Sequence, residues 1–230
     1  NKQTRRKELL QSFVQRVGAP LVYVNQVGAN DEILFDGRSV VIAKDGTVLF
    51  EMPNFREGLG IVEIDFSGKT AKVLSSTAFA QSKSDWEKLF AETSESSGAS
   101  EIEVLHRALI VGIRDYFRKT GFKKAVLGLS GGIDSAVVAC LATEALGPNN
   151  VIGVAMPSQF SSSHSLSDAE ALARNLGIEF RVHSLKFINT AVLMELKPSF
   201  QGGAPDVTEE NLQARLRGVF LMALANKRGA

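Results

Sequence analysis

The chain has 230 residues, of which 44% are apolar and 22% are charged, an ordinary composition for a protein with a buried core. Its net charge of +1 gives no overall field that would attract nucleic acid or an anionic membrane. The single cysteine, Cys140, excludes an intrachain disulfide framework and suits a reducing compartment. We therefore expect a cytoplasmic protein with neither nucleic acid nor a membrane as its partner.

The first third of the chain predicts one helix followed by strands. The helical spacing of apolar side chains is carried by Leu9, Leu10, Phe13, Val14 and Val17. Strands are predicted over residues 21–25, 39–43 and 59–65. The pairs Asp36-Gly37 and Asp45-Gly46 are turn signals on either side of the second strand. Because the third segment alternates apolar and polar side chains, we expect that strand to be half buried.

A change in composition and periodicity along the chain predicts a boundary between two domains. Residues 75–100 are rich in Ser, Thr, Lys and Glu and show little periodicity, and Ser94–Ser100 is the best linker candidate. The predicted division is a first domain over residues 1–75, a linker over 76–101 and a second domain over 102–230.

The second domain alternates helices and strands. A helix over 102–118 carries one apolar stripe, made of Leu105, Leu109, Ile113 and Phe117. Strands are predicted over 125–129, 151–156 and 178–184. The helix after the first strand covers 134–146, and a Ser165-x-x-Asp168 cap opens a second helix that ends at Gly177. This order predicts an α/β fold with a parallel, Rossmann-like sheet, whose ligands bind at the carboxyl ends of the strands.

Six residues between the first strand and its helix predict an anion site, Ser130-Gly-Gly-Ile-Asp-Ser135. Glycines let the backbone approach a ligand closely, and the N–H groups of the first helical turn face an anion. We expect the two serines to donate to phosphate oxygens. Asp134 is a poor phosphate contact, but its carboxylate suits a Mg²⁺ ion shared with the phosphates. No Gly-Lys-Ser/Thr follows, so the segment is not a Walker loop. The alternative is a glycine turn without a ligand.

This loop resembles the pyrophosphate loop of the N-type ATP pyrophosphatases, which adenylate a substrate with ATP. The loop alone leaves several members open, among them the synthetases of NAD, GMP, asparagine and argininosuccinate, and tRNA-modifying enzymes. The resemblance implies ATP and Mg²⁺ as cofactors and Asp134 as a metal ligand. The implied ATP-binding residues are Gly128, Leu129, Ser130, Gly131, Gly132, Ile133, Asp134, Ser135 and Met156.

Two further segments resemble the NAD synthetases that take ammonia from glutamine, namely Met156–Ser165 and Asp206–Gly218. In the second segment we expect Thr208 to cap a helix. Asn211 and Arg215 are four residues apart and share one helix face, and the resemblance implies that they bind deamido-NAD. Arg217 lies off that face, and we expect it to be structural.

Residues 20–37 resemble the later half of the nitrilase-like glutaminase domain of the same enzymes. That domain uses a cysteine, a glutamate and a lysine from upstream segments, so we expect no glutaminase catalytic residue in this chain. Cys140 lies on the apolar stripe Val137, Cys140, Leu141 and Ala145, and we expect it to be a buried structural residue.

The resemblance implies an enzyme that amidates deamido-NAD to NAD, with ATP and with glutamine or ammonia, through an adenylated intermediate, and that forms homo-oligomers. The chain lacks an initiator methionine, and it stops before the Thr-Gly-Asn-x-Ser-Glu segment of these synthetases. We therefore expect an internal piece of a longer protein, inactive alone. Two alternatives are another pyrophosphate-loop amidotransferase, such as a GMP synthetase, and a non-catalytic nucleotide-binding module.

Overall fold

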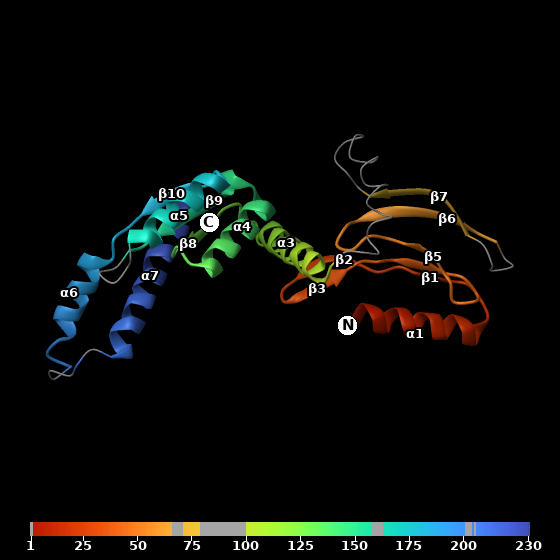
Figure 1. Cartoon of the computed structure of the whole chain (residues 1–230), viewed down its shortest axis with the longest axis horizontal. Coiled ribbons are helices and arrows are strands. Elements are labelled where there is room, and N and C mark those ends of the chain that lie inside the picture. Colours follow the sequence, from red (N-terminus) through yellow and green to blue (C-terminus); the bar gives the residue numbers. More distant parts are fainter. Residues whose placement is uncertain (1, 66–70, 79–99, 158–162, 201–203, 205) are drawn as a thin grey trace. The chain divides into compact units, whose positions relative to one another are not determined.

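The computed structural model describes residues 2–65, 71–78, 100–157, 163–200, 204 and 206–230. The chain divides into two compact units, Asn1–Asp115 and Tyr116–Ala230 (Figure 1). Helix α3 (Glu101–Thr120) begins in the first unit and ends in the second. Most of the expected linker, residues 79–99, lies outside the described residues, so the predicted domain division stays a prediction.

The first unit is built from one helix and short antiparallel strands. Its elements are α1 (Lys2–Val17), β1 (Leu21–Tyr23), β2 (Val27–Asn30), β3 (Ile33–Asp36), β4 (Val40–Ile42), β5 (Val48–Glu51), β6 (Gly58–Ile64) and β7 (Ala71–Ala78). Strands β1, β4 and β5 form one sheet in that spatial order, while β2–β3 and β6–β7 are hairpins. The three predicted strands are confirmed, and both predicted turn glycines, Gly37 and Gly46, have positive φ.

The core of the first unit lies between α1 and the β1-β4-β5 sheet. Val14, Val40 and Ile42 are buried there. Only one edge of the predicted helical stripe reaches the sheet, since Leu9 is 62% exposed and Val17 is 54% exposed. In β6 the partly buried apolar side chains are Val62 and Ile64, whereas Leu59 and Ile61 are exposed, so the expected half-burial involves one face of the strand.

The buried face of α3 is not the predicted stripe. Leu105 and Leu109 are exposed, while Ala108, Ile110 and Asp115 are buried. The β2–β3 hairpin explains the difference. The carboxylate of Asp115 accepts a hydrogen bond of 2.8 Å from the backbone N–H of Ala29 in β2. A polar side chain therefore belongs to the packed face, which a search for apolar periodicity does not detect.

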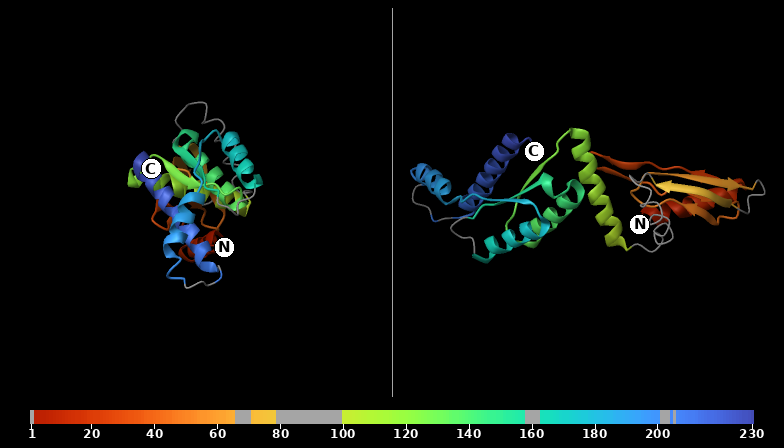
Figure 2. Two further views of the ribbon diagram at one scale, coloured as in Figure 1. Left: turned by 90° about the vertical axis from the view of Figure 1, so that its left-hand side faces the viewer. Right: turned by 90° about the horizontal axis from the view of Figure 1, so that it is seen from above.

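The second unit is a three-stranded parallel sheet with helices on both faces (Figure 2). Its elements are β8 (Ala125–Gly128), α4 (Ile133–Leu146), a 3₁₀ turn (Pro148–Asn150), β9 (Val151–Ala155), α5 (Ser163–Leu176), β10 (Glu179–Val182), α6 (Lys186–Leu196) and α7 (Val207–Arg228). The strands lie in the order β10-β9-β8 and are all parallel. The predicted α/β class with a parallel sheet is confirmed. Within the described ranges, no helix is long and apolar enough to cross a membrane.

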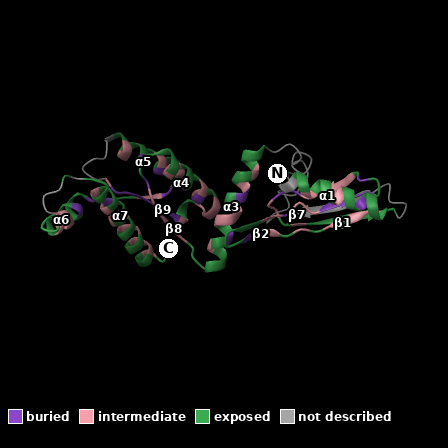
Figure 3. Ribbon diagram, turned by 90° about the horizontal axis from the view of Figure 1, so that it is seen from below, coloured by how far each residue is buried: buried purple, intermediate pink, exposed green. Residues whose placement is uncertain are grey.

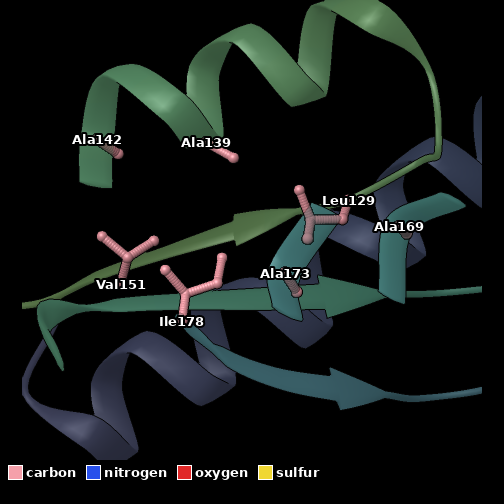
Figure 4. Close-up of a cluster of buried hydrophobic side chains, with 7 residues drawn as sticks. All are labelled: Leu129, Ala139, Ala142, Val151, Ala169, Ala173 and Ile178. Carbon is pink, nitrogen blue, oxygen red and sulfur yellow. The ribbon is translucent and has the colours of Figure 1, made fainter. Parts of the chain in front are cut away.

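Strand β9 is buried along its whole length because both of its faces are covered (Figure 3). On one face, Val151 packs with alanines of α4 and α5, and Figure 4 shows Ala139 and Ala142 of α4 directed at the sheet. On the other face, Ile152 and Val154 pack against α7. Successive side chains of a strand point to opposite faces, so a strand covered on both sides is a continuous apolar run. This three-layer arrangement leaves the carboxyl ends of the strands for ligands.

Candidate nucleotide site

A cavity of about 230 Å³ lies where β8 and β9 end. Because these strands are parallel neighbours, their carboxyl ends meet at one edge of the sheet. The structure thereby brings Gly128, Leu129 and Ser130 together with Met156 around one space. Most of the wall is apolar, and Leu221 of α7 contributes to it. The rest of the Met156–Ser165 segment includes residues 158–162, which lie outside the described residues.

The glycine loop is held by its own serines. Ser135 Oγ donates to the carbonyl of Gly132 at 2.9 Å, and it lies 3.0 Å from Ser130 Oγ. Ser130 Oγ in turn accepts from the N–H of Gly132 at 3.1 Å. The hydroxyl proton of Ser135 is thus used by Gly132, which leaves Ser130 as the donor between the two hydroxyls. Both hydroxyl protons are engaged inside the loop, so the expected donation to phosphate requires these bonds to exchange.

Gly131 places the loop against the start of α5. Its φ is +79°, and a Cβ built there would lie 2.4 Å from the carbonyl oxygen of Ser165. That neighbour is backbone and cannot move aside as a side chain would, so glycine is required for both conformation and space. Helix α5 begins at Ser163, two residues before the predicted cap at Ser165. The prediction was wrong because several serines precede this helix and each is a suitable cap.

The first turn of α4 is open to an anion. Gly132 is its N-cap and supplies no side chain to the free N–H groups of that turn. Ile133 is 75% exposed, and Asp134 is exposed beside it. Asp134 forms neither a hydrogen bond nor an ion pair with any residue that the structure describes. Uncapped N–H groups and the helix dipole together favour a phosphate at this position.

The carboxylate of Asp134 fits a magnesium ion only as one member of a larger ligand set. No group of three or more His, Cys, Asp or Glu side chains with metal-binding geometry occurs among the described residues. Mg²⁺ in nucleotide sites commonly takes one or two carboxylates plus phosphate oxygens. The donors present are therefore consistent with a metal that arrives with a nucleotide.

Helix α7 begins with a capping box two residues before the predicted cap. Asp206 Oδ1 accepts from the N–H of Thr208 at 2.7 Å, and Glu209 Oε2 accepts from the N–H of Asp206 at 2.8 Å. Asp206 is therefore the N-cap, and the prediction of Thr208 was wrong. The reciprocal pairing of Asp206 with Glu209 favours the earlier start. Hydrogen bonding to Thr208 also lowers the pKa of Asp206 below its usual value.

The two residues predicted to bind deamido-NAD lie outside the cavity wall. Asn211 and Arg215 are both exposed, and Arg215 Nη1 donates to the backbone carbonyl of Asn211 at 3.1 Å. Arg217, which we expected to be structural, instead lines the cavity. The spacing of Arg217 and Leu221, four residues apart, is the signal that places both on one face of the helix.

Cys140 is exposed, contrary to the prediction that it is buried. The buried residues of α4 are Ala139 and Ala142, while Val137 is 49% exposed. Helix α4 is apolar on nearly all sides, so its sequence pattern does not single out the face that meets the sheet. The packed face carries alanines because α4 lies close to the strands (Figure 4).

Comparison with known families decides the identity of this fold. The family model for NAD synthase matches residues 105–230, which include the glycine loop and α7. The chain belongs to the NAD synthase family. The carbon-nitrogen hydrolase model matches residues 3–71. The resemblance of both parts, inferred from the sequence, is thereby confirmed, and the GMP synthetase alternative is not favoured.

Individual members of the NAD synthase family match along nearly the whole chain. The glutamine-dependent NAD(+) synthetases of Synechocystis sp. and Rhodobacter capsulatus are 41% and 43% identical over 97% and 98% of this chain. The matched regions are 37% and 38% of those proteins. A solved structure of the glutamine-dependent NAD+ synthetase from Acinetobacter baumannii in complex with ADP is 36% identical, with a TM-score of 0.84. It covers 99% of this chain, which spans 40% of that structure.

Proposed function

We propose that the whole protein amidates deamido-NAD to NAD, using ATP and ammonia released from glutamine. The observation that carries this proposal is the match of residues 105–230 to NAD synthase, with the glycine loop placed at the carboxyl ends of β8 and β9. A carboxylate oxygen is a poor leaving group. Transfer of AMP to the nicotinate carboxylate creates a good one, which ammonia then displaces to give the amide.

ATP would bind with its phosphates on the loop Ser130–Ser135 and with its adenine near Met156. The free N–H groups at the start of α4 would stabilise charge that develops on the departing pyrophosphate. The apolar wall beside Met156 suits the nucleoside better than the phosphates. The solved relative in complex with ADP supports an adenine nucleotide as the ligand class.

Magnesium is the second expected cofactor, and Asp134 is the residue of this chain that would hold it. Bound there, Mg²⁺ would supply neutralising charge to the phosphates. The carboxylate lies at the start of α4, next to the open N–H groups. The two groups would bind different parts of a magnesium–nucleotide complex, because the carboxylate contacts the cation and the N–H groups contact the phosphates.

Deamido-NAD would be bound by Asn211 and Arg215, which lie one turn apart on α7. An amide and a guanidinium suit a ligand that carries hydroxyls and phosphates. Both side chains are exposed and are available to a ligand outside the cavity. We propose a homo-oligomer in the cytoplasm as the working form, and we propose no nucleic-acid or membrane partner.

The part of the chain that matches the carbon-nitrogen hydrolases contains no cysteine that could attack glutamine. The single cysteine of the chain, Cys140, is an exposed residue of α4 and lies outside residues 3–71, which match the carbon-nitrogen hydrolases. We therefore assign to residues 3–71 a place in the glutaminase domain and no catalytic residue. Substitution of Cys140 by alanine is expected to leave glutamine hydrolysis by the whole protein unchanged.

The proposed function is tested by assaying the whole protein for NAD formation from deamido-NAD and ATP. We expect NAD with either ammonium chloride or glutamine as the nitrogen source, together with pyrophosphate release that depends on deamido-NAD. Turnover with ammonium chloride but not with glutamine would support NAD synthesis and contradict the use of glutamine as the nitrogen source. ATP binding without turnover from either nitrogen source would overturn it in favour of a non-catalytic nucleotide-binding module.

A further inference from the structure

Helix α7 runs antiparallel to the strands, so its middle residues lie at the level of the glycine loop. Near its carboxyl end, Arg228 Nη2 lies 2.7 Å from Glu179 Oε2, at the amino end of β10. Seven residues earlier, about two helical turns, Leu221 Cδ1 lies 3.7 Å from the Cβ position of Gly128, the last residue of β8. Moving toward the amino end of α7 therefore leads past the carboxyl ends of the strands. Arg217 is one helical turn beyond Leu221, about 6 Å along the helix axis.

Arg217 is the one charged side chain among the described residues that line the cavity. It is half buried, and it forms no ion pair or hydrogen bond with any residue in the described ranges. Its neighbours on α7 behave differently, since Arg228 pairs with Glu179 and Arg215 bonds to Asn211. A partly desolvated guanidinium without an anion is costly unless a ligand supplies one.

The cavity offers two environments for one ligand. Met156 and Leu221 form its apolar part, whereas Ser130 and Arg217 supply polar groups at the level of the loop. No carboxylate lines the cavity among the described residues, so nothing there competes for the guanidinium. A nucleotide has the same division, because its base and sugar are less polar than its phosphates.

We propose that Arg217 binds the phosphate that is joined to the ribose of the bound nucleotide. This inference rests on the proposed function and adds a residue to it. The N–H groups at the start of α4 take the terminal phosphates, and the guanidinium forms charge-assisted hydrogen bonds to the phosphate nearest the nucleoside. That phosphate is the one transferred in adenylation, so Arg217 also holds the AMP group in place for attack by the substrate carboxylate.

The test compares adenosine, AMP and ATP as ligands of the whole protein by isothermal titration calorimetry. In Arg217→Gln, AMP and ATP should bind about tenfold more weakly, which is the expected loss of a hydrogen bond to a charged group. Adenosine should bind within about twofold of the unmodified protein, because it has no phosphate to lose. The affinity of Arg217→Lys for AMP should lie between those of Arg217→Gln and the unmodified protein, since lysine keeps the charge and loses the planar guanidinium.

The matched control is Arg174→Gln on α5, whose side chain is 74% exposed and pairs only with Glu170 among the described residues. It should bind all three ligands normally. Unchanged AMP affinity in Arg217→Gln would overturn the inference, and so would an equal loss for adenosine. Melting temperatures show whether each variant is folded. If Arg217→Gln unfolds, the affinities of Arg217→Lys for AMP and adenosine decide the test. An unmodified protein that binds no adenine nucleotide would contradict the proposed function itself.

Discussion

The charged side chains around the sheet of the first unit and those at the nucleotide site of the second unit are used in different ways. In the first unit, Arg6 contacts both carboxylate oxygens of Asp36, at 2.9 and 2.7 Å, and Arg38 and Lys7 both pair with Glu51. Hydrogen bonding to Asp36 raises the pKa of Arg6 above its usual value.

At the nucleotide site of the second unit, Asp134 lies in the first turn of α4 and Arg217 lines the cavity, and neither has a partner among the described residues. A paired charge is satisfied by the fold, whereas an unpaired charge at the end of a parallel sheet is available to a ligand. The comparison teaches that pairing, rather than the number of charges, distinguishes a structural surface from a binding site.

The largest effect on the nucleotide site is expected from adding a methyl group to the glycine loop. Gly131→Ala should lower ATP-dependent NAD formation on the order of 100-fold, because displacement of reacting groups by about 1 Å has that cost. The new Cβ would lie 2.4 Å from the carbonyl oxygen of Ser165. Steady-state kinetics of the whole protein measure the effect.

The matched control for that variant is Gly121→Ala. Gly121 has nearly the same backbone angle, with φ of +81°, but nothing lies within 4 Å of its Cβ position. It should cost about 1 kcal/mol of stability from backbone strain and leave activity nearly normal. An equal loss of activity in both variants would show that strain, and not contact with α5, explains the requirement for glycine.

Removing the unpaired charge at the start of α4 sharpens the comparison. Asp134→Asn should lower turnover about tenfold or more, and it should raise the Mg²⁺ concentration needed for half-maximal rate, because one metal ligand is weakened. Its melting temperature should fall only slightly, since Asp134 is exposed and the variant loses only a favourable interaction with the helix dipole of about 0.3–1 kcal/mol. Glu144→Gln, an exposed position on the same helix, is the control. A normal Mg²⁺ dependence in Asp134→Asn would contradict the metal role.

A satisfied carboxylate should behave in the opposite way. Asp115→Ala removes the buried acceptor for the N–H of Ala29 and should destabilise the first unit by about 1–3 kcal/mol, the cost of an unpaired buried donor. Hydrogen exchange at residues 27–30 measures the local effect, which should be faster in the variant. Asp115→Asn keeps an acceptor oxygen and should exchange more slowly than Asp115→Ala. Unchanged exchange in Asp115→Ala would show that this bond contributes nothing to the hairpin.

The smallest effect is expected at a paired charge of the second unit. Hydrogen bonding to Arg181, followed by the charge of Arg228, lowers the pKa of Glu179 below its usual value. A lowered carboxyl pKa contributes stability above the unfolded pKa, and that contribution is lost as the pH falls through the folded pKa. Glu179→Gln should therefore cost about 0.5 kcal/mol or less near neutral pH, as expected for exposed pairs, and nothing in strong acid. Urea titration at several pH values measures this loss of stability. A loss that persists in strong acid would exclude the ion pair as its cause.

Much of the second unit was predictable because its signals are local. Short apolar runs between helical segments locate β8, β9 and β10, and the glycine loop between β8 and α4 locates the site. In the first unit, β2, β3, β5 and β7 were not identified individually. These short strands pair with segments that a local pattern does not specify.

The residues that the sequence misplaced depend on the orientation of whole helices. Cys140 was expected to be buried because it lies on an apolar stripe of α4. That helix is apolar on nearly every side, however, and the sheet decides which face is packed. The expectation that Arg217 is structural followed from its position off the face shared by Asn211 and Arg215. Its place in the cavity wall depends on how α7 packs against β8, which the sequence of α7 alone does not specify. Asp206 and Thr208 are both suitable caps, and the choice between them follows from a bond to Glu209.

The hydroxyl network of the glycine loop has a consequence for the thermodynamics of nucleotide binding. Fixing the backbone of one residue costs about 1–2 kcal/mol in conformational entropy. Ser130, Gly132 and Ser135 are joined by hydrogen bonds that lie entirely within the loop. Folding has therefore met the entropic cost of ordering the loop before a nucleotide arrives. Association should then be rapid and require little rearrangement of the backbone, with the loop acting as a rigid template for the phosphates.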